Sequence, residues 1–171
     1  IYQVFKKRRI SMKNKKKALI LTVLCAFAAL LLTACGGKSS GSSDISADVS
    51  KLCQDLEGTI DSEVSEVSNE VIASTYFFDM DKIEEAAAAL NSGSNACEVV
   101  VLKCKDSSYT AEAEELLKKR VESQSTLFAS YNAPEVAKLD AAILKTKGNY
   151  VVFCVTDDTS KANEIIKEAG F

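Results

Sequence analysis

Apolar side chains recur every three or four positions along residues 107–131, and this spacing predicts a long helix. Ser108 or Thr110 is placed to cap its start, because a hydroxyl oxygen can accept from the free amides of the first turn. The apolar stripe of this helix consists of Ala113, Leu116, Leu117, Val121, Leu127, Phe128 and Tyr131. Residues 160–170 repeat the spacing and predict a last helix, with Gly170 at its end.

Two other segments are almost continuously apolar and rich in β-branched residues, which predicts strands. The first is "CEVVVLKC", residues 97–104. The second is "AAILKTKGNYVVFCVT", residues 141–156, which predicts a hairpin that turns at Gly148 and Asn149. Between the long helix and this hairpin, Pro134 fits the first turn of a short helix.

The first half of the chain has weaker patterns. Helical spacing predicts a helix over residues 45–56 and a short one near Glu70–Tyr76, and residues 58–71 keep helical spacing despite their β-branched side chains. The alanines of residues 86–89 favour helix, whereas the turn residues after them favour a hairpin with residues 97–104. We therefore expect a helical start at residues 81–85 that gives way to a strand.

The order of predicted elements is strand, strand, helix, strand, strand, helix, preceded by one or two short helices. Hairpins that alternate with helices indicate the α+β class. We expect an antiparallel sheet of about four strands with the helices packed on one face. Residues 45–171 are long enough to form this single domain around one core.

The N-terminal segment has the layout of a secretory signal. Residues 12–34 start with Met12, continue with four lysines and an apolar run from Ala18 to Leu32, and end in small residues. The run has 15 residues, whereas a membrane-spanning helix needs about 20. Residues 1–11 lack an initial Met and are interpreted as a non-native upstream extension.

Cys35 gives this signal a specific meaning. "LTAC", residues 32–35, resembles the bacterial lipobox, in which a peptidase cuts before the Cys and the thiol carries a diacylglycerol with fatty acyl chains such as palmitate. Two acyl chains hold a protein on a bilayer durably. Residues 35–44 then form a lipidated Cys followed by a flexible Gly/Ser linker. The predicted location is the extracytoplasmic face of the cell membrane.

Removal of the signal makes the chain strongly acidic. From Cys35 onward it carries 13 Lys and Arg against 24 Asp and Glu, a net charge near −11. Nucleic acids and anionic lipid head groups would be repelled, so no nucleic-acid partner is expected. A cationic partner, or simply a soluble surface, fits this charge better.

The residue types available limit the chemistry. The chain has no histidine, which excludes Ser–His and Cys–His catalysis and disfavours a zinc site. We expect no metal and no cofactor. Four cysteines follow Cys35, without any C-x-x-C pair, and each is interpreted as a core residue whose redox state stays open: Cys53, Cys97, Cys104 and Cys154. A Ser/Lys pair and pairs of carboxylates remain possible catalytic groups.

One polar pair lies on the apolar stripe of the long helix. Arg120 and Gln124 are one turn apart, and polar groups on such a face need partners. Arg120 could bind a ligand carboxylate, because its guanidinium matches that geometry. The alternative is an internal bond to a sheet carboxylate such as Glu98, or a stem that lies on the core.

Three segments together resemble a known family. They are "ACEVVVLKCKD", "LKKRVESQSTLFASYNAPEV" and "TKGNYVVFCVTDD", residues 96–106, 117–136 and 146–158. They are similar to an uncharacterised lipoprotein domain of clostridia-like, Gram-positive bacteria, a domain of unknown function. The resemblance implies export and a lipid anchor, and it brings no catalytic residues.

These patterns favour a non-catalytic binding or interaction module, held on the membrane through Cys35, that binds an unknown protein or small ligand. The alternative is a cell-envelope enzyme that uses carboxylates or a Ser/Lys pair. A third possibility is a structural accessory of an envelope complex.

Overall fold

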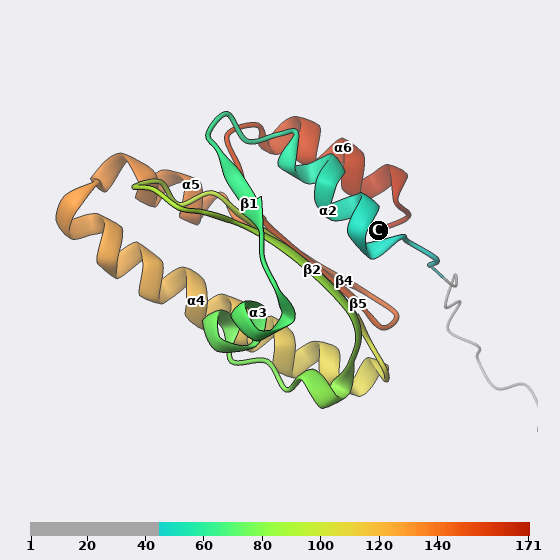
Figure 1. The fold of residues 1–171 in the computed structure, drawn as a ribbon. Helices are drawn as coiled ribbons and strands as arrows, with labels where there is room; N and C mark the ends of the chain where they lie inside the picture. Colours follow the sequence, from blue (N-terminus) through green and yellow to red (C-terminus); the bar gives the residue numbers. More distant parts are fainter. Residues whose placement is uncertain (1–44) are drawn as a thin grey trace, which may run out of the picture. The chain divides into compact units, whose positions relative to one another are not determined.

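A computed structural model describes residues 45–171 (Figure 1). The predicted upstream extension, signal and linker of residues 1–44, including Cys35, lie outside the described residues. Within residues 45–171, none of the helices has the length and apolar character needed to cross a bilayer.

One antiparallel sheet forms the centre of the domain, with its strands in the order β1-β2-β3-β5-β4. The α+β prediction is confirmed, with five strands where about four were expected. The strands are β1 (Val64–Glu66), β2 (Ile83–Asn91), β3 (Glu98–Cys104), β4 (Ile143–Lys147) and β5 (Tyr150–Val155). The additional strand, β1, lies where helical spacing had suggested a weak helix. That prediction was wrong, because the β-branched residues pair with the edge of β2 instead.

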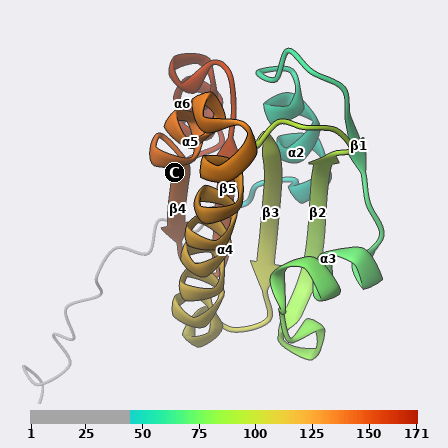
Figure 2. The same ribbon diagram turned by 90° about the vertical axis from the view of Figure 1, so that its left-hand side faces the viewer.

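The helices lie on both faces of the sheet, so the prediction of one covered face was wrong (Figures 1 and 2). Every residue of β5 and all but Lys103 of β3 is buried, and strands that are apolar on both sides need cover on both sides. The helices are α2 (Val49–Glu57), α3 (Asn69–Tyr76), α4 (Thr110–Tyr131), α5 (Val136–Asp140) and α6 (Thr159–Glu168). Helices α2 and α6 pack on one face, and α3, α4 and α5 pack on the other.

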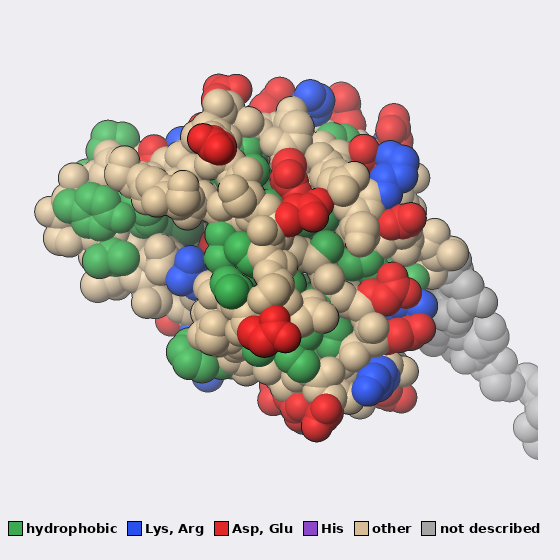
Figure 3. Space-filling view, in the orientation of Figure 1, with side chains coloured by type: hydrophobic (Ala, Val, Ile, Leu, Met, Phe, Trp, Pro, Cys, Tyr) green, Lys and Arg blue, Asp and Glu red, His purple; other side chains and the backbone are tan. Residues whose placement is uncertain are grey.

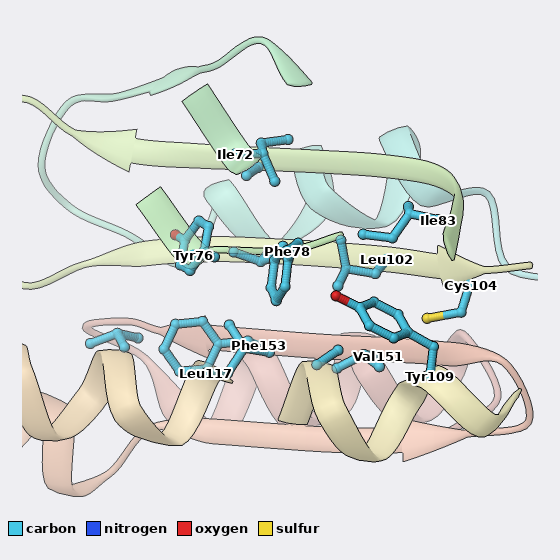
Figure 4. Packing of buried hydrophobic residues seen from close by; sticks show 14 of the residues in the cluster. Ile72, Tyr76, Phe78, Ile83, Leu102, Cys104, Tyr109, Leu117, Val151 and Phe153 are labelled. Carbon is cyan, nitrogen blue, oxygen red and sulfur yellow. The ribbon is translucent and has the colours of Figure 1, made fainter. Parts of the chain in front are cut away.

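The alternation of strand residues divides the core into two clusters. Leu102, Val151 and Phe153 point toward α3 and α4, where Tyr76, Phe78 and Leu117 meet them (Figure 4). Val101, Val152 and Cys154 point the other way, toward α2 and α6. The sheet therefore separates two apolar layers while both remain attached to the same central strands.

The alanine-rich segment is strand β2, as its turn residues had indicated and against its helix propensity. The expected helical start at residues 81–85 is wrong: a 3₁₀ turn at Met80–Lys82 ends before the strand starts at Ile83. Pairing with β3 along the strand and with β1 at its end outweighs the propensity of Ala. Small side chains also suit this strand because helices pack over both of its faces.

The predicted hairpin turn forms, whereas the predicted cap of the long helix does not. The hairpin turns at Gly148 and Asn149 as expected, and Gly148 has a φ of 58°. Neither Ser108 nor Thr110 caps α4, so that prediction was wrong. A 3₁₀ turn, Ser107–Tyr109, precedes the helix instead, and the Asp106 carboxylate accepts from the Ser108 amide. Asp106 thus caps the 3₁₀ turn that leads into α4.

Phe77 is the one non-glycine residue of the described chain with positive φ, at 62°, and it is 78% exposed. This left-handed backbone is unfavourable for a bulky residue and tolerable for asparagine. Phe77→Asn should raise the free energy of unfolding by about 0.5–1 kcal/mol in urea denaturation. The substitution relieves the unfavourable backbone conformation, and it removes little buried apolar area.

The adjacent Phe78 is the matched control, since it is 5% exposed and stacks on Tyr76 with ring centroids 5.4 Å apart. Phe78→Asn should lower the free energy of unfolding by at least about 3 kcal/mol. Equal losses at both positions would contradict this account of Phe77.

Candidate functional site

Arg120 and Glu98 form a buried ion pair at the start of β3. Glu98 is 3% exposed, and Nε and Nη2 of Arg120 both donate to its carboxylate, with the shortest contact 2.9 Å from Nη2 to Oε2. Tyr76 of α3 donates its hydroxyl to the same carboxylate at 3.0 Å. The guanidinium also lies 5.6 Å from the centroid of the Tyr76 ring.

This geometry answers the question raised by the apolar stripe of α4. The internal bond to Glu98 is confirmed. Two nitrogens of the Arg120 guanidinium bind this strand carboxylate and are not available to a ligand. Burial by itself would lower the pKa of Arg120, but the hydrogen bonds and charge of Glu98 raise it. Gln124 is half-buried one turn further along α4 and takes no part in the network. The structure therefore does not bring the two predicted ligand-binding residues into one site.

A second polar cluster joins four segments at one end of the sheet. The Lys138 ammonium lies 2.8 Å from Asp157 and 3.1 Å from Glu135, and 3.8 Å from the Cys97 sulfur. The Cys97 thiol donates to Asp157 at 3.5 Å. The backbone amides of Asp61 and Ala96 donate to Asp157 and Glu135, respectively, at 2.9 Å. Sequence reasoning missed this cluster because Cys97, Asp157 and the Glu135–Lys138 pair lie in segments far apart in the sequence.

The electrostatics of this cluster do not activate the thiol. Burial raises the pKa of Cys97 to about 12, since the nearby Lys138 charge opposes burial only in part. A thiol with that pKa remains protonated near neutral pH, whereas a nucleophilic cysteine acts as the thiolate. The remaining cysteines are buried free thiols, which confirms their interpretation as core residues: Cys53, Cys104 and Cys154. Burial raises their pKa values to about 12, 11 and 12, respectively.

A groove of about 640 Å³ lies between α2 and α6. Its apolar surface comes from Leu52 of α2 and Ile165 of α6, with Ala47 and Ala169. Lys51 pairs with Asp55 at 2.5 Å, and Lys161 donates to the Gly58 carbonyl at 3.0 Å. Asp48 and Glu168 also line the groove, and among the described residues neither has an ion-pair partner. Within residues 45–171 Lys161 has no carboxylate partner either, so two carboxylates against one ammonium leave the groove a net charge of −1.

Residues 45–171 contain no group of three or more side chains placed to hold a metal ion. The candidate sites in this part of the chain are the two polar clusters and the groove.

The comparisons give one match. A family model described as "Domain of unknown function (DUF4358)" matches residues 58–156. The matched range contains all five strands with α3, α4 and α5, and it leaves out α2 and α6. No curated protein and no solved structure matches the chain.

The buried pair makes a specific prediction about stability. Arg120→Met leaves the Glu98 carboxylate buried without a cation, which should lower the free energy of unfolding by about 3–5 kcal/mol. The double variant Arg120→Met with Glu98→Leu should recover most of this loss, because no buried charge remains. Urea unfolding of the two single variants and the double variant measures the coupling, and additive losses would contradict it.

A pH prediction follows from Asp157. Burial would raise the pKa of Asp157, but hydrogen bonds from Lys138 and the Asp61 amide hold it below its usual range. A lowered folded-state pKa adds stability above the unfolded value, about 3.9, and this stability is lost as pH falls through the folded value. Asp157→Asn should therefore destabilise the chain at pH 7 and have a smaller effect below about pH 3.

Urea unfolding at both pH values checks this expectation. Asp55→Asn is the control, since the ion pair of Asp55 with Lys51 lies on the exposed side of α2. An effect of Asp157→Asn that stays constant down to pH 2.5 would count against the assignment.

Proposed function

The chain belongs to the DUF4358 family, a family of unknown function, and from this premise we propose that it is a lipid-anchored extracytoplasmic domain that binds a ligand without catalysis. The observation that carries the proposal is the α2–α6 groove, with its apolar surface and two carboxylates, Asp48 and Glu168, that have no ion-pair partner among the described residues. The setting inferred from the resemblance is the envelope of a Gram-positive bacterium.

The sequence supports the anchor. The charged start, apolar run and small residues of residues 12–34 precede Cys35 in the order that lipidation requires. The described chain starts at Ile45, whose side chain packs against the core beside Gly148 and Gly170. Nine residues separate Cys35 from Ile45, so the backbone of Ile45 is tethered within about 36 Å of the backbone of Cys35.

The groove supports a ligand of particular chemistry. An apolar ligand body would cover Leu52 and Ile165, and a positively charged group would meet Asp48 and Glu168. The net charge near −11 from Cys35 onward would attract the same class of ligand. A short cationic peptide with an apolar side chain satisfies both features.

The polar clusters support binding over catalysis. Arg120 is held by Glu98, and Lys138 lies between two carboxylates, so both cations are committed to internal partners. The protonated thiol of Cys97 is a poor nucleophile. These groups stabilise the fold that carries the groove.

The anchor is tested by Cys35→Ser. The parent chain should fractionate with membranes and, by intact mass, begin at a diacylated Cys35. The variant should lose the acyl mass and leave the membrane fraction. Cys53→Ser is the control, because that thiol is buried and should not affect anchoring. An unacylated parent chain would refute the anchor while leaving the groove open to test.

The groove is tested by titrating the ¹⁵N-labelled full-length chain with leucyl-lysine amide, and with leucyl-glutamate as the matched probe. Amide signals of Ala47, Lys51 and Ile165 should shift with the cationic probe only. Glu168→Gln should weaken binding by about two- to fivefold, as expected for one exposed ion pair. Glu164→Gln, on α6 but outside the groove, should have no effect. Equal shifts with both probes, or shifts only on another surface, would refute this site.

A further inference from the structure

Helix α4 changes character along its length. Its first half carries acidic residues followed by basic ones, including Lys118, which pairs with Glu114 and Glu115. The next 12 residues, 123–134 ("SQSTLFASYNAP"), contain no charged side chain. In a chain where 26% of residues are charged, such a stretch on an exposed helix is unusual.

The uncharged half of α4 exposes two large apolar side chains one turn apart. Leu127 is 51% exposed and Tyr131 is 56% exposed, while Phe128 between them is buried and packs against the Tyr131 ring. Ser123 and Ser130 are also exposed and continue the same helical stripe, and Thr126 and Pro134 are exposed beside it. In Figure 3 the end of the domain where α4 ends shows mostly hydrophobic and uncharged surface.

A second uncharged segment lies beside it. The turn between β2 and β3, residues 92–95, is "SGSN", and its Ser94 carbonyl accepts from the Asn132 side chain at 2.9 Å. We name residues 92–95 and 123–134 together the neutral tip. Depletion of charge together with exposed Tyr and Leu is the composition of an interface centre.

We propose that the neutral tip binds a second copy of this chain. Two copies with a net charge near −11 repel each other wherever acidic surfaces meet. At the neutral tip they can meet without placing carboxylates against each other. The surface is therefore complementary to itself in charge, as a two-fold symmetric contact requires.

The stripe also suits such a contact sterically. Antiparallel packing of two α4 halves would place Leu127 of one copy against the same helix of the other, with small Ser123 and Ser130 allowing close approach. Nine helical residues, Ser123–Tyr131, are few beside the about 20–30 residues a side of a stable interface. The contact is therefore weak in free solution, and confinement on a membrane would raise its occupancy.

Disulfide crosslinking tests the contact directly. Ser130→Cys places a thiol on the stripe and keeps Leu127 and Tyr131, and the natural cysteines of the domain are buried. The full chain is oxidised in the cell fraction where it is found, and dimers are measured on non-reducing gels. Ser130→Cys should give at least about tenfold more dimer than Glu164→Cys, an exposed control position on α6.

Adding Leu127→Glu to Ser130→Cys should reduce the dimer by about tenfold or more, because it places like charges across the contact. Three results would overturn the proposal: equal dimer at both cysteine positions, no dimer at either, or dimer unaffected by Leu127→Glu. A Ser130→Cys adduct with the mass of another protein would also overturn it. Intact mass of the same sample reports whether Cys35 is acylated, so failure of the anchor and failure of the contact are distinguishable.

Discussion

The fold depends on how the buried carboxylate of Glu98 is satisfied. Glu98 starts the central strand β3, paired with β2 on one side and β5 on the other, where water cannot reach it. A carboxylate there is stable only with charged and hydrogen-bonding partners. These are Tyr76 and Arg120, each 22 residues away in sequence, in opposite directions. One carboxylate thus fixes the positions of α3 and α4 on the sheet.

The sequence was sufficient where one element determines its own pattern. The stripe of α4 and the turn at Gly148 are local signals, and both elements form as predicted. The sequence was insufficient where pairing with another strand determines the secondary structure of a segment. Ala86–Ala89 forms a strand only because β3 and β1 pair with it. Val64 lies in a strand because it pairs with the edge of β2. The prediction of helices on one face overlooked the uninterrupted apolar run of β5, which is buried on both faces and requires helices on both sides.

The same distinction applies to the polar sites. A long cation on an apolar stripe must find an internal anion or a ligand, so the bond of Arg120 to Glu98 could be anticipated from residue types alone. The contacts of Lys138 could not be anticipated. Asp157 follows β5, Cys97 precedes β3 and Glu135 ends the short turn before α5, and only the tertiary fold brings Asp157 and Cys97 to Lys138.

The sheet also separates two surfaces of different chemistry. The α2–α6 groove contains two carboxylates without an ion-pair partner among the described residues and suits a cation, whereas the neutral tip has no charge. Strand residues alternate between the two layers, so a substitution beneath one surface leaves the packing of the other largely intact. The family match includes the tip and the Glu98 network and stops short of α2 and α6. The groove therefore requires both flanking helices, while the tip requires only the matched region.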